Sequence, residues 1–127
     1  MSKIAVLTVD EPVRIDLRRL EQIIGELGEA TAVQIIGTAL EQLALALTRT
    51  VAAVERIDHV GAVTHAEQLA RLAWQVGLVT LAAVAVDVGS CAERRDRAGL
   101  AATSARLQRI GNRSLTEIWE VPPRPPD

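Results

Sequence analysis

The segment "HAEQLARLAWQVGL" (residues 65–78) predicts a helix that ends at a glycine. With the residues just before it, the segment places small and aliphatic side chains on one face at helical spacing, as expected for a helix packed against others. These side chains are Ala62, Ala66, Leu69, Ala73 and Val76. Asp58 is placed to cap the start of the helix, and Gly77 should bend or end it.

Two helices precede this segment. A short one fits residues 17–27, with Asp16 as its N-cap. A long one fits residues 32–56, where Thr31 and Gln34 have the spacing of a capping box. Its apolar stripe is Ile36, Leu40, Leu43, Leu47, Val51 and Val54. Spacings of three and four residues in this stripe predict one buried helix face.

Two helices follow the segment. One starts near Leu78, and the other covers residues 100–119, with Asp96 as a candidate N-cap and Gly111 expected to loosen it midway. The inward side chains are Leu81, Val84, Val88 and Cys91 on the first, and Leu100, Thr103, Leu107, Ile110 and Ile118 on the second. Four long amphipathic helices joined by short turns predict an all-α fold, an antiparallel up-down four-helix bundle with a short N-terminal helix.

The chain of 127 residues suits one domain, which we place at residues 16–119. Residues 1–15 alternate weakly and contain a proline, so we expect an extended N-terminal arm. The arm could pack on the domain or pair with another chain, and we expect the first. Residues 120–127 form a proline-rich tail, because consecutive prolines cannot continue a helix.

Composition excludes several classes of protein. The net charge of −2 gives no electrostatic footprint for nucleic acid. The single Cys91 excludes an internal disulfide and fits a reducing compartment. The longest apolar run, residues 76–86, is about half the length that a membrane span needs. We therefore expect a cytoplasmic protein that binds neither nucleic acid nor a membrane.

The order of the elements and one local motif resemble the histidine phosphotransfer (Hpt) domains, the four-helix intermediates of bacterial phosphorelays. The resemblance covers residues 15 to 119. Residues 66–78, "AEQLARLAWQVGL", align with the family pattern Ala-His-x-Leu-Lys-Gly-Ser-Ala-x-x-Val-Gly-Leu. The matching positions are Ala66, Leu69, Ala73, Val76, Gly77 and Leu78. The resemblance implies an Hpt-like bundle in a two-component signal transduction pathway.

The departures from the family fall on its functional positions. Glu67 stands where the family has its phosphoaccepting histidine, Ala70 where it has a lysine, and Arg71 where it has a glycine. The resemblance therefore implies a scaffold that has lost phosphotransfer chemistry. Glu67 and Arg71 are spaced to form a surface ion pair, and Trp74 next to them has the composition of a protein-contact hot spot. Trp74 could instead cover a gap against a neighbouring helix or the N-terminal arm.

His65 is the other candidate phosphoacceptor. A helix advances about 100° per residue, so His65 and Glu67 point roughly 200° apart. We expect a partly buried histidine, away from the face that the resemblance implies for partner binding. Asp58, His59 and His65 are too few and too loosely spaced to predict a metal site, and no cofactor is expected.

Three functions stay open on the sequence. The first is a non-catalytic Hpt-like module that binds a response-regulator receiver domain or a histidine kinase through Glu67, Ala70, Arg71 and Trp74. The second is an active phosphotransfer protein that uses His65. The third is a structural bundle that forms a homodimer. We expect a protein-binding module rather than an enzyme.

Overall fold

The computed structural model describes residues 11–120, and within this range the chain is helical. The helices are α2 (Leu17–Leu27), α3 (Glu29–Glu55), α4 (His59–Gln75), α5 (Val79–Arg94) and α6 (Arg97–Glu117), followed by the 3-10 turn η1 (Ile118–Glu120). An isolated bridge between Ile15 and Leu78 is the β pairing found in residues 11–120. The all-α prediction is confirmed. The first ten residues of the expected arm and residues 121–127 of the proline-rich tail lie outside the described range.

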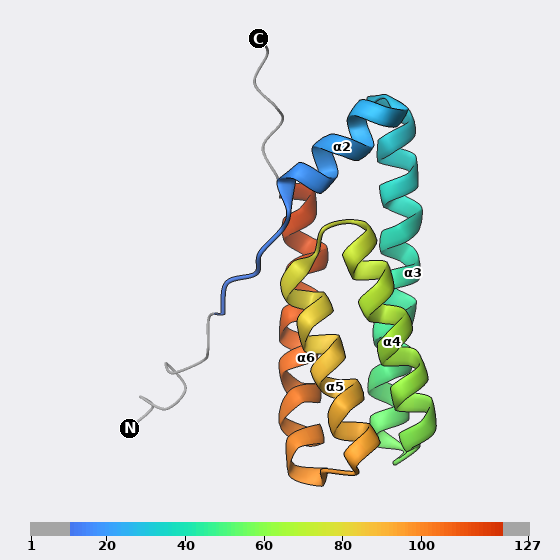
Figure 1. Ribbon diagram of the computed structural model, residues 1–127, viewed down its shortest axis with the longest axis vertical. Helices are drawn as coiled ribbons and strands as arrows, with labels where there is room; N and C mark the ends of the chain where they lie inside the picture. The colour runs from blue at the N-terminus through green and yellow to red at the C-terminus, as the bar shows by residue number, and fades with distance from the viewer. Residues whose placement is uncertain (1–10, 121–127) are drawn as a thin grey trace.

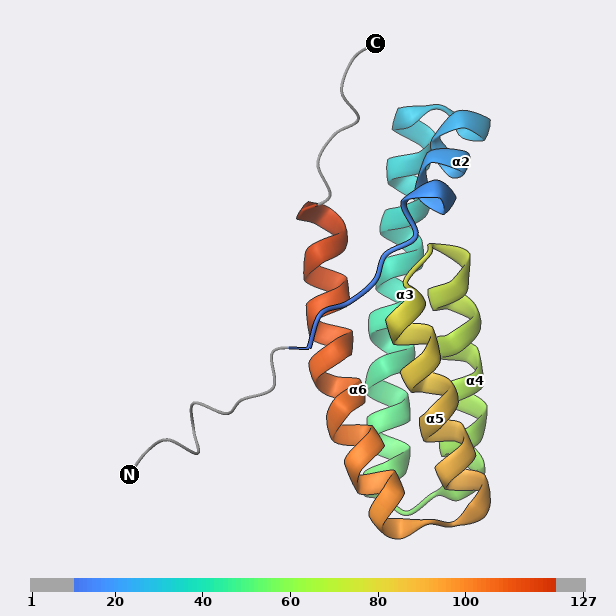
Figure 2. The same ribbon diagram turned by 60° about the vertical axis from the view of Figure 1, so that its left-hand side comes forward.

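Helices α3, α4, α5 and α6 lie side by side along their lengths, and each runs opposite to the one before it in the chain (Figure 1). The contacts follow the order α3, α4, α5, α6 and close back from α6 to α3 (Figure 2). Helix α2 lies obliquely at one end and packs against α3, which extends past the turn that joins α4 to α5. This arrangement leaves the outer face of α4 and α5 open along most of its length.

The expected capping aspartates begin three of the helices. Asp16 accepts hydrogen bonds from the backbone N–H groups of Arg18 and Arg19, at 3.1 and 3.3 Å. The carboxylates of Asp58 and Asp96 each accept one from a glycine N–H three residues later, at 2.9 and 3.0 Å. Each side chain satisfies helix donors that have no partner inside the helix.

Two predictions about helix boundaries are wrong. Helix α3 begins at Glu29, directly after Gly28, so Thr31 lies inside its first turn and forms no capping box with Gln34. Gly28 ends α2 and starts α3 at φ +83°, a conformation that glycine adopts readily. Helix α6 begins at Arg97, three residues earlier than expected, and continues through Gly111. Gly111 is buried against α3, so close packing compensates for its low helix propensity.

The core is built from aliphatic and small side chains of all four long helices. The side chains predicted to be buried together are Leu40, Leu47, Leu69, Val76, Leu81, Val88 and Leu107. All seven belong to the buried cluster. Cys91 also lies in this cluster, as its place on the apolar stripe of its helix predicts. Deleting one of the large side chains should cost about 2–5 kcal/mol, because the gap left behind closes only in part.

Residues 11–16, here called the strap, are extended and lie against the start of α5 and against α6 (Figure 2). Val13 and Ile15 pack against the core. The carboxylate of Glu11 is held by the guanidinium of Arg106 on α6. The described part of the arm therefore packs on its own domain, as expected.

Helix α3 is, among the described residues, the helix that is long and apolar enough to cross a membrane by length and composition. Core helices of soluble proteins meet the same criteria, and α3 packs its inner face on α4 and α6. Its first turns and α2 expose large apolar side chains at one end of the molecule. These are Leu17, Ile24 and Leu27 on α2 and Val33 and Ile35 on α3.

Candidate protein-contact site

Helices α4 and α5 make the most extensive contact between elements of the described residues, and both bury several small residues. On α4 these are Ala62, Ala66, Ala70 and Ala73, and on α5 they are Ala82, Ala85 and Ala92. Gly89 belongs to the same contact, since a Cβ built on it would lie 3.6 Å from the Cβ of Ala66. Small residues let the two backbones approach each other. The outward-facing side chains of the two helices are then separated only by a narrow strip of small buried residues.

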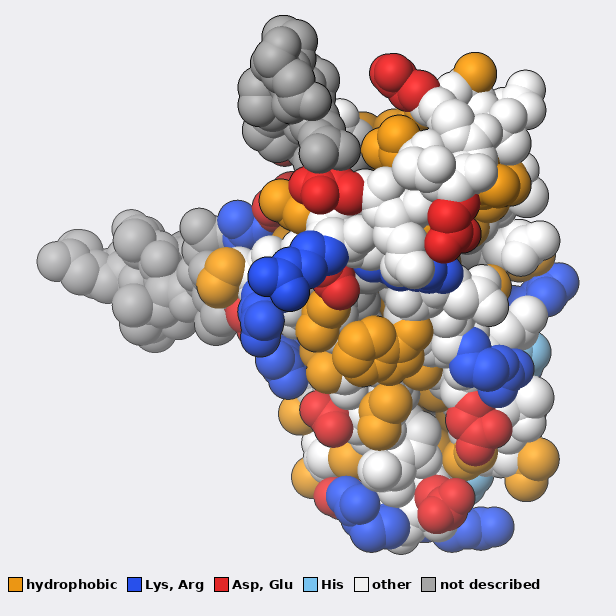
Figure 3. All heavy atoms as spheres, turned by 45° about the horizontal axis from the view of Figure 1, so that its top comes forward, with side chains coloured by type: hydrophobic (Ala, Val, Ile, Leu, Met, Phe, Trp, Pro, Cys, Tyr) orange, Lys and Arg blue, Asp and Glu red, His pale blue; other side chains and the backbone are white. Residues whose placement is uncertain are grey.

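A shallow groove of about 300 Å³ runs between the two helices on their outer side. Helix α4 contributes Val63, Glu67, Ala70 and Arg71, and α5 contributes Ala85, Val86, Gly89, Ser90 and Glu93. We call this the α4–α5 groove. Figure 3 shows a patch of hydrophobic side chains near the middle of the face that it draws, with acidic and basic side chains around it. The groove combines an apolar floor with charged walls, as protein-contact surfaces do.

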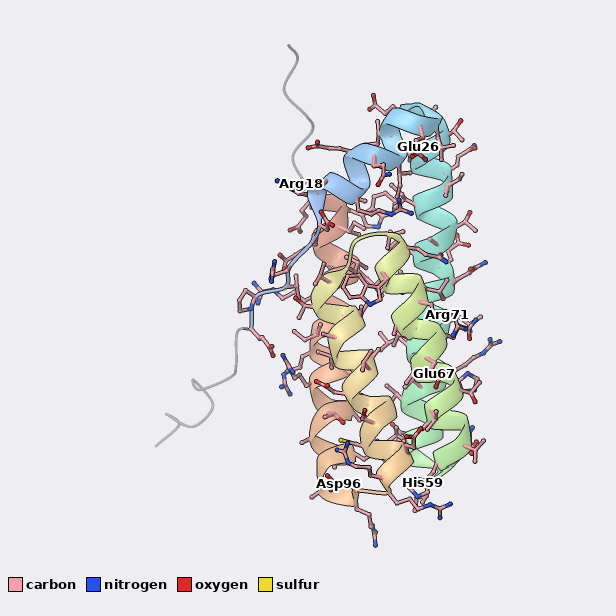
Figure 4. All side chains as sticks on the ribbon, in the orientation of Figure 1. Arg18, Glu26, His59, Glu67, Arg71 and Asp96 are labelled. Atoms are coloured by element: carbon pink, nitrogen blue, oxygen red, sulfur yellow. The ribbon has the colours of Figure 1, made fainter. Side chains whose placement is uncertain are left out.

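Three of the four predicted site residues of α4, Glu67, Ala70 and Arg71, line this groove, whereas Trp74 lies outside the lining. Ala70 is 7% exposed and forms part of the floor, while Glu67 and Arg71 are exposed on its wall. Figure 4 shows these two charged side chains on successive turns of α4. Trp74 follows one turn further along, and 56% of its surface is exposed. Of the two alternatives for Trp74, an exposed contact residue and a cover over a gap, this exposure favours the first.

The ion pair expected between Glu67 and Arg71 does not form. No salt bridge joins the two side chains, although they are four residues apart on one helix. An exposed pair of this kind stabilises a helix by only about 0.2–0.5 kcal/mol, and fixing two long side chains costs entropy. Both charges are therefore free to contact another molecule at the groove.

His65 lies away from the groove. It is two residues before Glu67, which turns it by roughly 200° around α4, and it is absent from the groove lining. The residue is half-buried, as predicted, and its buried Nδ1 atom has no hydrogen-bond partner among the described residues. A phosphoryl group on this side chain would not face the surface formed by Arg71 and Trp74.

The sequence interpretation missed the contribution of α5. Val86, Ser90 and Glu93 complete the groove opposite Glu67 and Arg71. Their spacing of four and three residues marks one face of α5, outside its buried stripe. The sequence contains this spacing, but it does not show which helix the face lies beside. The packing of α5 against α4 places the face opposite Glu67 and Arg71.

Other reactive groups do not form a site in the described part of the chain. Cys91 is buried, and its sulfur lies 3.7 Å from Nη2 of Arg94. Residues 11–120 contain no cluster of three or more histidine, cysteine, aspartate or glutamate side chains that could hold a metal ion. A second groove of about 300 Å³ lies between α3 and α6, lined by Leu47, Val51, Glu55 and Asn112 among others, but the α4–α5 groove is the one that contains predicted site residues.

A second group of charged contacts lies where the strap meets α6. Hydrogen bonds from the Arg106 guanidinium lower the pKa of Glu11 below its ordinary value, with Arg109 adding a smaller effect. The same hydrogen bonds raise the pKa of Arg106. Arg106 also lies 3.9 Å from the carboxylate of Asp87 on α5. These charges anchor the strap and are not part of the groove.

Comparison with known proteins gives no match, whether to a family model, to a curated protein or to a solved structure.

Proposed function

We propose that this protein is an Hpt-like module of a bacterial two-component phosphorelay, with the up-down four-helix bundle of that family. In this proposal it acts in the cytoplasm and carries no phosphate. It binds a response-regulator receiver domain or a histidine kinase through the α4–α5 groove. Binding without transfer would sequester the partner, or hold it in place, within the signal transduction pathway.

One observation carries the proposal. The three positions at which the resemblance expects phosphotransfer chemistry, Glu67, Ala70 and Arg71, all line one groove. Neither of the two histidines of the chain lies there. A carboxylate cannot replace the imidazole as a stable phosphate carrier in such a relay. The surface is suited to contact, and its residue types argue against transfer.

The chemistry of the groove edge supports protein binding. Trp74 is a large exposed aromatic one turn from Arg71, and tryptophan and arginine are enriched among residues that dominate binding energy. Val86 on α5 exposes a further apolar side chain across the groove. A partner that covers these side chains would gain apolar burial at the centre and charge pairing at Glu67 and Glu93 on the rim.

Titration of the protein with receiver domains and kinase domains from the same organism tests the proposal. Each receiver is used both unmodified and phosphorylated, and acid-labile phosphate on this chain is measured in the same samples. We expect saturable binding to at least one domain and no phosphate transfer. Phosphohistidine on the wild type that is lost in His65→Ala would instead establish the active phosphotransfer alternative.

Self-association is a second candidate, favoured by the apolar side chains that α2 and the first turns of α3 expose. Exposed apolar groups that cluster at one end of a molecule often mark an interface. Sedimentation equilibrium over a wide concentration range tests this candidate. A mass of 13.6 kDa at all concentrations would exclude the homodimer.

A further inference from the structure

The strap is joined at one end to the turn between α4 and α5. The backbone N–H of Asp16 donates to the carbonyl of Gly77 at 2.7 Å, and the N–H of Val79 donates to the carbonyl of Arg14 at 3.1 Å. The N–H of Arg14 donates to Oγ1 of Thr80 at 2.8 Å. These bonds run from the strap to Gly77, in the turn before α5, and to the first turn of α5.

At its other end the strap is held by charge. Nε of Arg106 donates to both carboxylate oxygens of Glu11 at 3.0 Å, and its Nη2 donates to one of them as well. The backbone carbonyl of Glu11 accepts from Nη1 of Arg113 at 3.1 Å. A paired carboxylate and guanidinium of this geometry is among the stronger side-chain contacts. Glu11 thus fastens the N-terminal end of the strap to α6.

The turn that the strap holds also completes α4. The N–H of Gly77 donates to the carbonyl of Trp74 at 3.2 Å, and the N–H of Leu78 donates to the carbonyl of Ala73 at 2.9 Å. These carbonyl groups belong to the last turn of α4, and the carbonyl oxygens of a last turn have no hydrogen-bond donors within their own helix. The strap therefore supports the turn, and the turn supports the helical segment that carries Trp74.

A second link comes from α2, directly after the strap. Nε of Arg19 donates to the carbonyl of Gln75 at 2.9 Å. The backbone of Asp16 also lies close to Gly77, since a Cβ on that glycine would lie 2.8 Å from the Asp16 carbonyl oxygen. Release of the strap would therefore break the hydrogen bond from Asp16 to Gly77 and at the same time loosen the packing of Asp16 on Gly77.

We propose that the strap is a latch that controls the α4–α5 contact face. With Glu11 bound to Arg106, the last turn of α4 is complete, and Trp74 keeps its place one helical turn after Arg71. When Glu11 is released, the strap and the turn loosen, the end of α4 frays, and Trp74 loses its fixed position. That the controlled surface binds a partner rests on the proposed function, whereas the latch itself is a property of this chain alone.

Amide hydrogen exchange of Glu11→Gln against wild type tests the latch without any partner. Three amides report it: those of Arg14 and Asp16 on the strap and that of Leu78 in the turn. Loss of one charge-assisted contact on a partly exposed surface should speed exchange at all three by about fivefold. The matched control is Glu21→Gln on α2, an exposed glutamate that forms none of the strap contacts, where no change is expected.

Fluorescence reports the contact face in the same variants. The chain has two tryptophans and no tyrosine or phenylalanine, so Trp119→Phe leaves Trp74 as the single tryptophan. In that background, Glu11→Gln should lower the steady-state anisotropy of Trp74, and Glu21→Gln should not. Raising the salt concentration to 1 M should reproduce the change in the parent protein, because salt screens the Glu11–Arg106 contact.

Faster exchange confined to Arg14 and Asp16, with Leu78 and Trp74 unchanged, would overturn the latch, because the strap would then move independently of the turn. Unchanged exchange at all three amides would overturn it as well. If the exchange and anisotropy changes occur but no receiver or kinase domain binds the wild type, the latch stands and the proposed function fails. The two inferences are therefore tested separately.

Discussion

Gly111 on α6 lies directly against Leu47 on α3, with no space for a side chain between them. A Cβ at Gly111 would lie 2.6 Å from Cδ2 of Leu47 and 3.2 Å from its Cδ1. This contact explains why a helix-weakening residue is present in the middle of α6. The glycine lets two antiparallel helices of the bundle approach at this level.

Two of the mid-helix glycines, Gly37 and Gly111, should therefore respond in opposite ways to alanine. Gly37→Ala on α3 should raise the free energy of unfolding by about 0.5–1 kcal/mol, because alanine favours the helix and the new methyl group meets nothing within 4 Å. Gly111→Ala gains the same helix propensity, but its methyl group overpacks the buried contact with Leu47. This overpacking should cost about 1–3 kcal/mol of folding free energy. Urea denaturation of both variants measures the difference, and a stabilised Gly111→Ala protein would contradict the packing argument.

Two helices end in left-handed residues that are not glycine. Ile57 after α3 has φ +60°, and the N–H of Asp58 donates to the carbonyl of Ala53 at 2.9 Å, which is the Schellman pattern. A β-branched residue in this conformation is strained, and Ile57 is 66% exposed, so little packing is lost on its removal. Ile57→Gly should raise the free energy of unfolding by about 1 kcal/mol, as measured by urea denaturation.

Gly77, after α4, is the matched case in which glycine is already present. Its φ is +78°, and a Cβ would meet the backbone oxygen of Asp16 at 2.8 Å. Gly77→Ala should therefore destabilise by more than about 1 kcal/mol, since backbone strain and a backbone clash add. If Ile57→Gly and Gly77→Ala change the free energy of unfolding by equal amounts of opposite sign, the clash between residue 77 and the Asp16 carbonyl oxygen is absent.

Much of the fold follows from local signals that the sequence carries plainly. Asp16, Asp58 and Asp96 stand directly before apolar periodic segments, and each caps a helix as predicted. The start of α3 was missed because the N-cap preference for threonine suggested Thr31, whereas Gly28 both ends α2 and begins α3. Gly111 was misjudged because intrinsic propensity does not include a neighbouring helix. Tertiary packing overrides propensity at such positions.

The candidate site was predicted only in part for a similar reason. Residues on one helix, such as Glu67 and Arg71, share a face by spacing alone. The residues across the groove, such as Val86 and Glu93, depend on the register between α4 and α5, which no spacing within one helix determines. The strap contact between Glu11 and Arg106 joins residues that are 95 apart in the chain, and no local sequence pattern predicts it.

The contact of Glu11 with Arg106 predicts a dependence of stability on pH. The pKa of Glu11 is lowered in the folded protein, so its carboxylate stabilises the fold above the pKa of the unfolded chain. This contribution falls as the pH drops below about 4.3, the ordinary value of a glutamate, and is lost below the folded pKa. The stability difference between wild type and Glu11→Gln should therefore be full at neutral pH and shrink in acid. Thermal denaturation at several pH values measures it, and a constant difference would contradict the assignment.

Trp74→Ala should weaken binding of the partner domain by about 2 kcal/mol, because the exposed indole at the groove edge would be buried in the contact. His65→Ala should leave binding largely unchanged, since His65 lies on the other side of α4 from the groove. Trp119→Phe is the matched control for loss of an exposed tryptophan elsewhere. Isothermal titration with the bound receiver or kinase domain gives the three affinities. A Trp74→Ala protein that binds as well as wild type would exclude this surface.

Restoration of the three family residue types at the groove tests whether the scaffold still supports phosphotransfer. The triple variant Glu67→His, Ala70→Lys and Arg71→Gly introduces at the groove the residue types of the family that this chain resembles. Glu67 is exposed, so an imidazole at position 67 would face solvent. Ala70 forms the floor, so a lysine there must extend its chain along the groove to bring its charge near a phosphoryl group.

Removal of the Arg71 side chain should open the space beside residue 67 to the active-site loop of a partner. We expect the triple variant to gain acid-labile phosphate from a phosphorylated receiver domain, while Glu67→His alone gains little. The control is the triple variant with alanine in place of histidine at position 67, which should bind the receiver and accept no phosphate. Absence of phosphate on the triple variant, despite binding equal to wild type, would show that the groove does not hold position 67 against a receiver's active site.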